Sequence, residues 1–147
     1  MGSMNDVLIV SADYYKDISN QLFAGAENVL ADQGLTVKKI EVPGVFEIPS
    51  VVAKAWVTKK YLGVITLGCV IRGATDHYEY ICGEVSRELM ELTVKLSMPH
   101  GFGILTCENY EQALERASIN DRNCGGRAAI ACCQVMEIHK KIDDGSL

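Results

Sequence analysis

The hydrophobic and polar positions of the chain follow two alternating periodicities, which predict strands and helices in turn. Short aliphatic or β-branched runs predict buried strands, at Val7–Ser11, Thr36–Val42, Gly63–Cys69 and Gly101–Thr106. Apolar residues at intervals of three and four predict helices after each strand, over Tyr15–Gln33, from Pro49 to about Lys59, over Tyr78–Ser97, from Asn109 to about Ser118, and from about Gly125 to Ile142. Strands that alternate with helices predict a parallel sheet with helices on both faces and right-handed crossovers.

Capping signals support these boundaries. Gly34 follows the first helix as a C-cap residue, Pro49 fits a first helical turn, and Pro99 ends the third helix. The run Asn109-Tyr110-Glu111-Gln112 resembles a capping box that opens the fourth helix.

The last predicted helix is apolar on nearly all sides. Its apolar residues are Ala128, Ala129, Ile130, Ala131, Cys132, Cys133, Val135, Met136 and Ile138. A terminal helix that packs one face on a sheet needs one apolar stripe, so the second stripe indicates either a subunit contact or deep burial.

Composition restricts the class of protein. The 147 residues and 16.1 kDa fit one domain, 48% apolar residues exclude a disordered chain, and 22% charged residues exclude a membrane protein. The net charge of −5 disfavours nucleic acid as a partner. The first three residues, 1–3, look like an expression scar, and neither a membrane span nor a secretory signal is visible, so residues 4–147 are expected to form one cytoplasmic domain.

Six cysteines form no CxxC pair. Their pattern is typical of reduced thiols that fill the core of a cytoplasmic protein. Three scattered histidines offer no zinc-ligand spacing, so a metal site is not expected.

Unusual residues gather where the predicted strands end, which is where open parallel sheets bind ligands. In the loop Arg72–His77, small residues allow close backbone approach, the helix start favours an anion, and His77 can transfer protons near neutral pH. The alternative is a loop whose Thr75 or Asp76 only caps the helix. The loop lacks the lysine of a nucleotide-binding P-loop.

Two further segments carry candidate binding residues. Within Val42–Pro49, Phe46 and Glu47 stand at a helix start, either to bind a ligand or to fill the core and cap the helix. Tyr14 and Tyr15 follow the first strand, either to stack on a flat ring or as surface tyrosines. Arg116 alone would be interpreted as a solvated residue.

The chain resembles the 6,7-dimethyl-8-ribityllumazine synthases from about Val7 to about His139. The matching stretches are QLFAGAENVL at 21–30, VPGVFEIP at 42–49, ITLGCVIRGATDHYEY at 65–80 and FGILTCENYEQALERA at 102–117. The resemblance implies a flavodoxin-like, three-layer α/β/α domain with a four-stranded parallel sheet. It also implies a transferase that condenses 5-amino-6-(D-ribitylamino)uracil with 3,4-dihydroxy-2-butanone 4-phosphate, releasing phosphate and water without a metal or organic cofactor.

The resemblance also implies a role for each candidate residue. Tyr14 corresponds to an aromatic residue that stacks on the pyrimidine, and His77 to the residue that transfers protons. The segment that holds the uracil edge and the ribityl chain corresponds to Val45, Phe46 and Glu47. The backbone that contacts the heterocycle corresponds to Cys69, Val70 and Ile71. The phosphate loop corresponds to Gly73, Ala74 and Thr75. Phe102 and Arg116 correspond to an aromatic wall and a phosphate-binding arginine from a neighbouring subunit, in a homopentamer or a multiple of pentamers with its active sites at the subunit interfaces.

Three positions depart from the family pattern. Asp13 and Cys124 stand where many members have arginine and lysine, and the loop 118–124 lacks the Gly-Lys-rich sequence associated with 60-subunit shells, which favours a pentamer or a pair of pentamers. Two other functions remain open: a module that binds a flavin or lumazine without catalysis, and a hydrolase that pairs Cys69 or Cys107 with His77.

Overall fold

A four-stranded parallel sheet forms the centre of the molecule. The computed structural model describes residues 4–73 and 77–147. The strands are β1 (Asp6–Ala12), β2 (Thr36–Val42), β3 (Gly63–Ile71) and β4 (His100–Cys107). Their spatial order is β2-β1-β3-β4, and each neighbouring pair is parallel. This order places β1 and β3 in the middle, which explains their almost completely buried aliphatic sequences.

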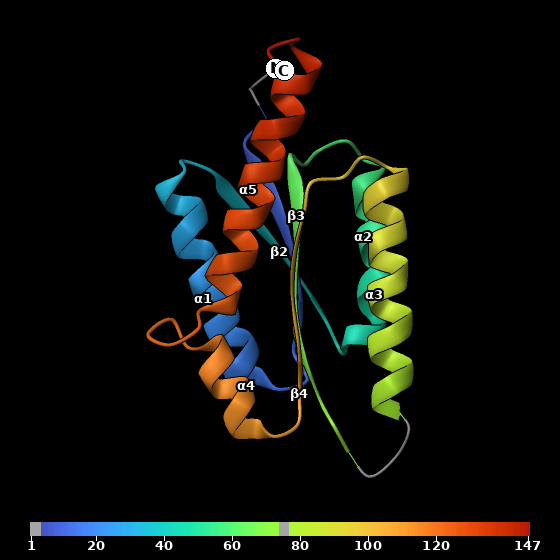
Figure 1. Ribbon diagram of the computed structural model, residues 1–147, viewed down its shortest axis with the longest axis vertical. Coiled ribbons are helices and arrows are strands. Elements are labelled where there is room, and N and C mark those ends of the chain that lie inside the picture. Colours follow the sequence, from blue (N-terminus) through green and yellow to red (C-terminus); the bar gives the residue numbers. More distant parts are fainter. Residues whose placement is uncertain (1–3, 74–76) are drawn as a thin grey trace.

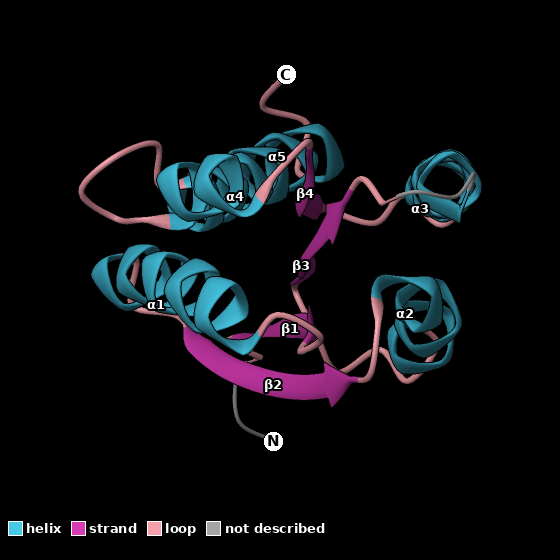
Figure 2. Cartoon of the chain, turned by 90° about the horizontal axis from the view of Figure 1, so that it is seen from below, coloured by secondary structure: helices cyan, strands magenta, loops and turns pink. Residues whose placement is uncertain are grey.

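Helices cover both faces of the sheet. They are α1 (Lys16–Asp32), α2 (Ile48–Trp56), α3 (His77–Lys95), α4 (Tyr110–Ala117) and α5 (Cys124–Asp143), and a short 3-10 turn, η1 (Val45–Glu47), precedes α2. Figure 2 shows α1, α4 and α5 on one face and α2 and α3 on the other. The predicted single-domain, three-layer α/β/α fold with a flavodoxin-like parallel sheet is therefore confirmed.

The predicted element boundaries hold to within a few residues. Gly34 has φ +71° directly after the C-cap of α1, as a C-terminal glycine should. The prediction that α2 continues to about Lys59 was wrong: the helix ends at Trp56, and Lys59 has φ 60°, which is incompatible with a continuing right-handed helix.

The sheet separates two hydrophobic clusters because alternate side chains of each strand point to opposite faces. Val7 and Ile9 of β1 pack toward α1 and α5, whereas Leu8 and Val10 pack toward α2 and α3. Every one of these four side chains is fully buried. Burial on both faces fixes the register of the strands, and with it the positions at which the strands end.

Helix α5 approaches its neighbours too closely for ordinary side chains at two glycines. A Cβ atom on Gly125 would overlap the backbone of Leu22 in α1, and one on Gly101 of β4 would overlap the carbonyl group of Ala128. The first turn of α5 therefore packs backbone against backbone with α1.

The outer side of α5 carries the second apolar stripe that the sequence predicted. Ala128, Ala129 and Cys132 are buried, whereas Ile130, Ile138 and Ile142 are exposed in the isolated chain. The deep-burial alternative is therefore excluded for these isoleucines. Among the described residues, no helix is long and apolar enough to cross a membrane.

Candidate active site

A cavity of about 410 Å³ opens where β1, β2 and β3 end. In Figure 1 these strand ends lie at the bottom of the view, at the opposite end of the sheet from the C-terminus. Most of the predicted site residues line this cavity: Tyr14, Val45, Phe46, Glu47, Cys69, Val70, Ile71, Gly73 and His77. Ala74 and Thr75 lie outside the described residues. Residues that are distant in sequence thus meet in one cavity, as the rule for open parallel sheets predicts.

Sequence reasoning missed two residues of the cavity wall. Tyr78 and Ile81 line it from the first turns of α3, although their spacing identified them only as part of an apolar helical stripe. The available signal was their position one and four residues after His77, which places them beside the same loop. They add an aromatic and an aliphatic surface to a cavity that Tyr14, Tyr15 and Phe46 also line.

The β1 end presents an aromatic pair. Tyr14 is 75% exposed, and its ring lies 4.9 Å from that of Tyr15 in an edge-on arrangement at 74°. Burial raises the pKa of Tyr15, so its hydroxyl group stays neutral. One face of the Tyr14 ring is therefore available to stack on a planar ligand.

The β2 end is held next to the β1 end, and it positions the η1 turn. The backbone N–H of Asp13 donates to the carbonyl oxygen of Val42 at 3.0 Å, and the N–H of Glu47 donates to the carbonyl oxygen of Gly44 at 3.2 Å. Within the turn, Val45 is buried and anchors it, whereas Phe46 and Glu47 are exposed. The Glu47 carboxylate is consequently free of the core and able to accept hydrogen bonds from a ligand.

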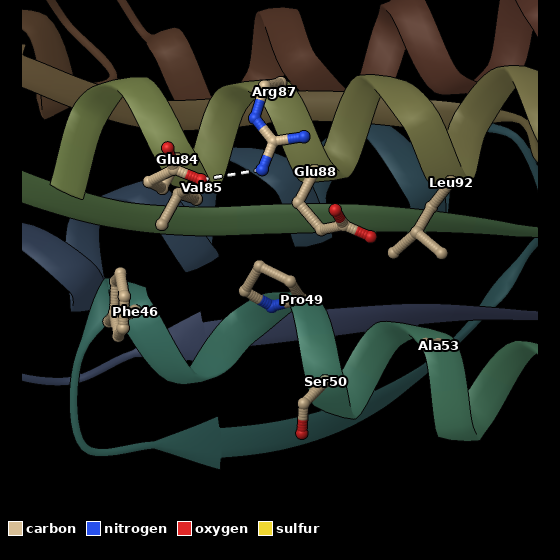
Figure 3. A pocket seen from close by; sticks show the side chains of 9 residues that line it. All are labelled: Phe46, Pro49, Ser50, Ala53, Glu84, Val85, Arg87, Glu88 and Leu92. Atoms are coloured by element: carbon tan, nitrogen blue, oxygen red, sulfur yellow. Dashed lines mark hydrogen bonds and ion pairs between the residues drawn. The ribbon is translucent and has the colours of Figure 1, made fainter. Parts of the chain in front are cut away.

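Phe46 also borders a second hollow, between α2 and α3. This groove has a volume of about 360 Å³. Figure 3 shows the side chains that line it, among them Arg87 and Glu84 of α3, which form an ion pair; the two charged groups lie 2.7 Å apart. Arg87 also lies 3.5 Å from Glu91. Because this guanidinium group is paired with carboxylates on its own helix, it is poorly suited to bind an anion there.

The β3 end is followed, after a short connection, by His77. His77 is the first residue of α3 and is exposed. Before it, Arg72 pairs with Glu79 at 2.6 Å and with Glu108 at 2.8 Å, and its guanidinium carbon lies 4.3 Å from the ring centre of Tyr78. These contacts explain Arg72 structurally: it fastens the β3 end to α3 and to the residue after β4.

Phe102 and Arg116 lie outside the cavity in their own chain. Phe102 is on edge strand β4, 46% exposed, and packs edge-on against His100 at 6.1 Å. Arg116, on α4, donates through Nη1 to the carbonyl oxygen of Thr106 at 3.1 Å and to the sulfur of Cys107 at 3.4 Å. Neither Phe102 nor Arg116 therefore lines the cavity of its own chain.

The Cys69 thiol, which lines the cavity, is a poor nucleophile. All six cysteines are free, and burial raises the pKa of Cys69 to about 12. A thiol with such a pKa remains protonated at neutral pH, which argues against the hydrolase alternative that uses Cys69. Among the described residues, no group of three or more His, Cys, Asp or Glu side chains could hold a metal ion.

The two unusual positions beside the site have their own environments. Asp13 is half-buried, and its pKa is raised by burial and by the nearby Glu41. Cys124 begins α5, half-buried, and burial raises its pKa although Arg127, Arg116 and Arg122 act in the opposite direction. The α5 start is thus surrounded by positive charge.

Comparison with known proteins gives one consistent result. Residues 5–140 match the family model described as 6,7-dimethyl-8-ribityllumazine synthase. Proteins of that name from Bartonella tribocorum and Agrobacterium fabrum are 45% and 43% identical to the chain over 139 and 141 residues. These alignments cover 94% and 92% of this chain, and 92% and 95% of the respective relatives. A protein of the same name from Methylorubrum populi is 42% identical, with 91% of this chain and 82% of the relative covered.

Proposed function

The chain belongs to the 6,7-dimethyl-8-ribityllumazine synthase family of riboflavin-biosynthesis transferases, and on this premise we propose its substrates and the role of each site residue. The reaction joins 5-amino-6-(D-ribitylamino)uracil to 3,4-dihydroxy-2-butanone 4-phosphate. Its products are 6,7-dimethyl-8-ribityllumazine, phosphate and water. The observation that carries the proposal is the meeting of Tyr14, Phe46, Glu47 and His77 from three separate strand ends in one cavity.

The pyrimidine substrate binds between β1 and η1. Tyr14 stacks on its ring, since this side chain is exposed beside the cavity. The residues that hold the uracil edge and the ribityl chain are Val45, Phe46 and Glu47. The backbone of the β3 end contacts the heterocycle, at Cys69, Val70 and Ile71. A flat aromatic face and a carboxylate suit a planar ring with N–H groups and a chain of hydroxyl groups.

The phosphate substrate binds at the β3–α3 loop. Gly73, Ala74 and Thr75 provide the anion site, and the N-terminus of the long helix α3 favours negative charge there. A fixed phosphate holds the butanone carbonyl group near the 5-amino group of the other substrate. Positioning of the two substrates then supplies much of the rate, without a protein nucleophile.

His77 transfers protons during the condensation. Imine formation, loss of phosphate and ring closure each require proton movement, and an imidazole can act in both directions near neutral pH. The position of His77 on the cavity wall, in the first turn of α3, supports this role.

A complete site includes two residues from a neighbouring subunit. Phe102 forms an aromatic wall and Arg116 binds the phosphate from across the interface, in a homopentamer or a multiple of pentamers. Neither Phe102 nor Arg116 lines the cavity of its own chain, which supports this arrangement, as do the exposed isoleucines of α5. The six free thiols support a cytoplasmic location, where cysteines stay reduced.

A turnover assay tests the proposed reaction. The purified protein is mixed with both substrates, and lumazine absorbance and phosphate release are followed together. We expect both products to form in equal amounts, faster than in the spontaneous reaction. Absence of turnover above the spontaneous rate contradicts the proposal, and tight binding of lumazine without turnover favours a non-catalytic binding module.

A further inference from the structure

Cys69 and Cys107 bring two thiols together on neighbouring strands. Cys69 is paired with Leu105 and Cys107 with Ile71, so the two cysteines lie diagonally across the β3–β4 pair and point to the same face. Both belong to the core cluster on that face. The pair lies directly beneath the cavity, because Cys69 also lines it.

A positive charge accompanies the two sulfur atoms. Nη1 of Arg116 lies 3.4 Å from Sγ of Cys107, and the same guanidinium group acts electrostatically on Cys69. Cys107 is 1% exposed and Cys69 is 7% exposed. Access from solvent therefore leads through the cavity to Cys69, and the charge that forms there is shielded little by water.

The strand register places these two cysteines too far apart to form a disulfide. Two residues along a parallel strand advance by about 6.6 Å and neighbouring strands lie about 4.8 Å apart, so the Cα atoms of such diagonal positions are about 8 Å apart. Disulfides require Cα atoms about 4.4–6.8 Å apart. An ion placed between the two sulfur atoms spans such a pair without movement of the backbone. Thiolates select soft ions, and Cu⁺ is a biological example.

We propose that Cys69 and Cys107 form a two-thiolate site for a soft, filled-shell cation such as Cu⁺. Binding exchanges two S–H bonds for two metal–sulfur bonds and releases two protons to solvent, and the ion keeps its oxidation state. The resulting bis-thiolate complex of Cu⁺ carries one negative charge, which the adjacent Arg116 balances. Because the site rests on two neighbouring strands, the inference does not depend on the proposed reaction.

A competition titration tests the site. Cu⁺ is added without oxygen to the full-length protein in the presence of a coloured Cu⁺ chelator. The reference protein carries Cys82→Ser, Cys124→Ser and Cys133→Ser, so that these free, half-buried thiols do not compete for the ion. We expect one Cu⁺ per reference chain, and an affinity reduced by roughly tenfold or more after the further change Cys69→Ser or Cys107→Ser. Unchanged affinity in folded variants of both kinds overturns the proposal.

X-ray absorption spectroscopy provides a second test that needs no substitution at the pair. The copper spectrum of the loaded reference protein is expected to show sulfur neighbours alone. Oxygen or nitrogen neighbours overturn the proposal, because the two sulfur atoms would then not hold the ion. Circular dichroism of each variant verifies that a lost affinity is not a lost fold.

Discussion

The hydroxyl oxygen of Thr66 lies 2.9 Å from Nε2 of His100, inside the layer between the sheet and α3. On the other side of the ring, the hydroxyl oxygen of Thr93 lies 3.2 Å from Nδ1 and donates its own proton to the carbonyl oxygen of Leu89 at 2.7 Å. Thr93 must therefore accept a hydrogen bond from Nδ1–H, which leaves Nε2 to accept the Thr66 proton. Both ring nitrogens of His100 are thus satisfied by a neutral imidazole.

Neutral His100 predicts an acid-sensitive fold. Burial lowers the pKa of His100 from 6.5 to about 4. Between pH 6.5 and 4 the unfolded chain takes up a proton on His100 that the folded chain does not. The free energy of unfolding should therefore fall by about 3 kcal/mol as the pH is lowered from 6.5 to 4. Above pH 6.5 His100 should have no effect on it. Urea unfolding of the wild type and of His100→Gln at pH 7 and pH 4 measures the difference. An equal loss in both proteins contradicts the prediction.

Replacement of His77 should affect catalysis more than binding. His77→Ala is expected to lower the rate of lumazine formation by roughly a hundredfold, since it removes the proposed proton-transfer group, while a pyrimidine substrate analogue still binds. Steady-state kinetics and calorimetric titration of the analogue separate the two effects. His139→Ala, on α5, is the matched control and should retain activity. If analogue binding disappears together with turnover, His77 has a structural role.

Removal of Arg116 should weaken binding of the phosphate substrate. Arg116→Ala is expected to raise the KM for the butanone phosphate by roughly tenfold or more, because a charge-assisted contact to phosphate is lost. Arg87→Ala removes an arginine that pairs only with Glu84 and Glu91 in the described part of the chain, and it should leave this KM unchanged. An unchanged KM in Arg116→Ala excludes the arginine from the phosphate site.

Mixing two inactive variants tests whether neighbouring chains share a site. If His77 and Arg116 of adjacent subunits serve one site, then co-assembly of His77→Ala with Arg116→Ala chains in equal amounts restores about a quarter of the sites. The measurement is turnover after unfolding and refolding the two variants together, compared with refolding each alone. No recovery in mixed oligomers indicates that each chain uses its own two residues.

Two glycine substitutions should change stability in opposite directions. Gly125→Ala forces a methyl group against the backbone of Leu22 and should destabilise the protein by about 1–3 kcal/mol. Gly83→Ala, on an exposed part of α3 with no atom within 4 Å of the new Cβ, should stabilise it by roughly 0.5–1 kcal/mol. Thermal unfolding at one fixed protein concentration compares them. Similar effects of the two changes would show that the α1–α5 contact yields easily.

Local sequence signals predicted the helices and strands, but they could not predict contacts between distant segments. The bounds of β2 and the Asn109 cap of α4 are confirmed, because they depend on residues next to each other in sequence; Oδ1 of Asn109 accepts from the N–H of Gln112 at 2.9 Å. The partners of His100, in contrast, are 34 and 7 residues away. No local pattern specifies such a pairing, since it arises from strand register and helix packing.

The candidate site shows the same division. The strand-end rule gathered Tyr14, Phe46 and His77 correctly, because parallel strands carry their carboxyl ends to one edge. The rule could not show that Arg72 forms ion pairs with Glu79 on α3 and with Glu108 after β4. A charged residue in a loop has the same appearance in sequence whether it binds a ligand or a neighbouring carboxylate.

The contact between Gly125 and Leu22 also restricts how this gene can change. Any single-base substitution at the first or second position of a glycine codon introduces a side chain or a stop, and at Gly125 every side chain meets the backbone of α1. Selection should therefore remove almost every such variant at this position, whereas Gly83 is open to drift. Among natural variants of the gene, the Gly125 codon should therefore carry synonymous changes alone, as a consequence of the packing of α5 on α1.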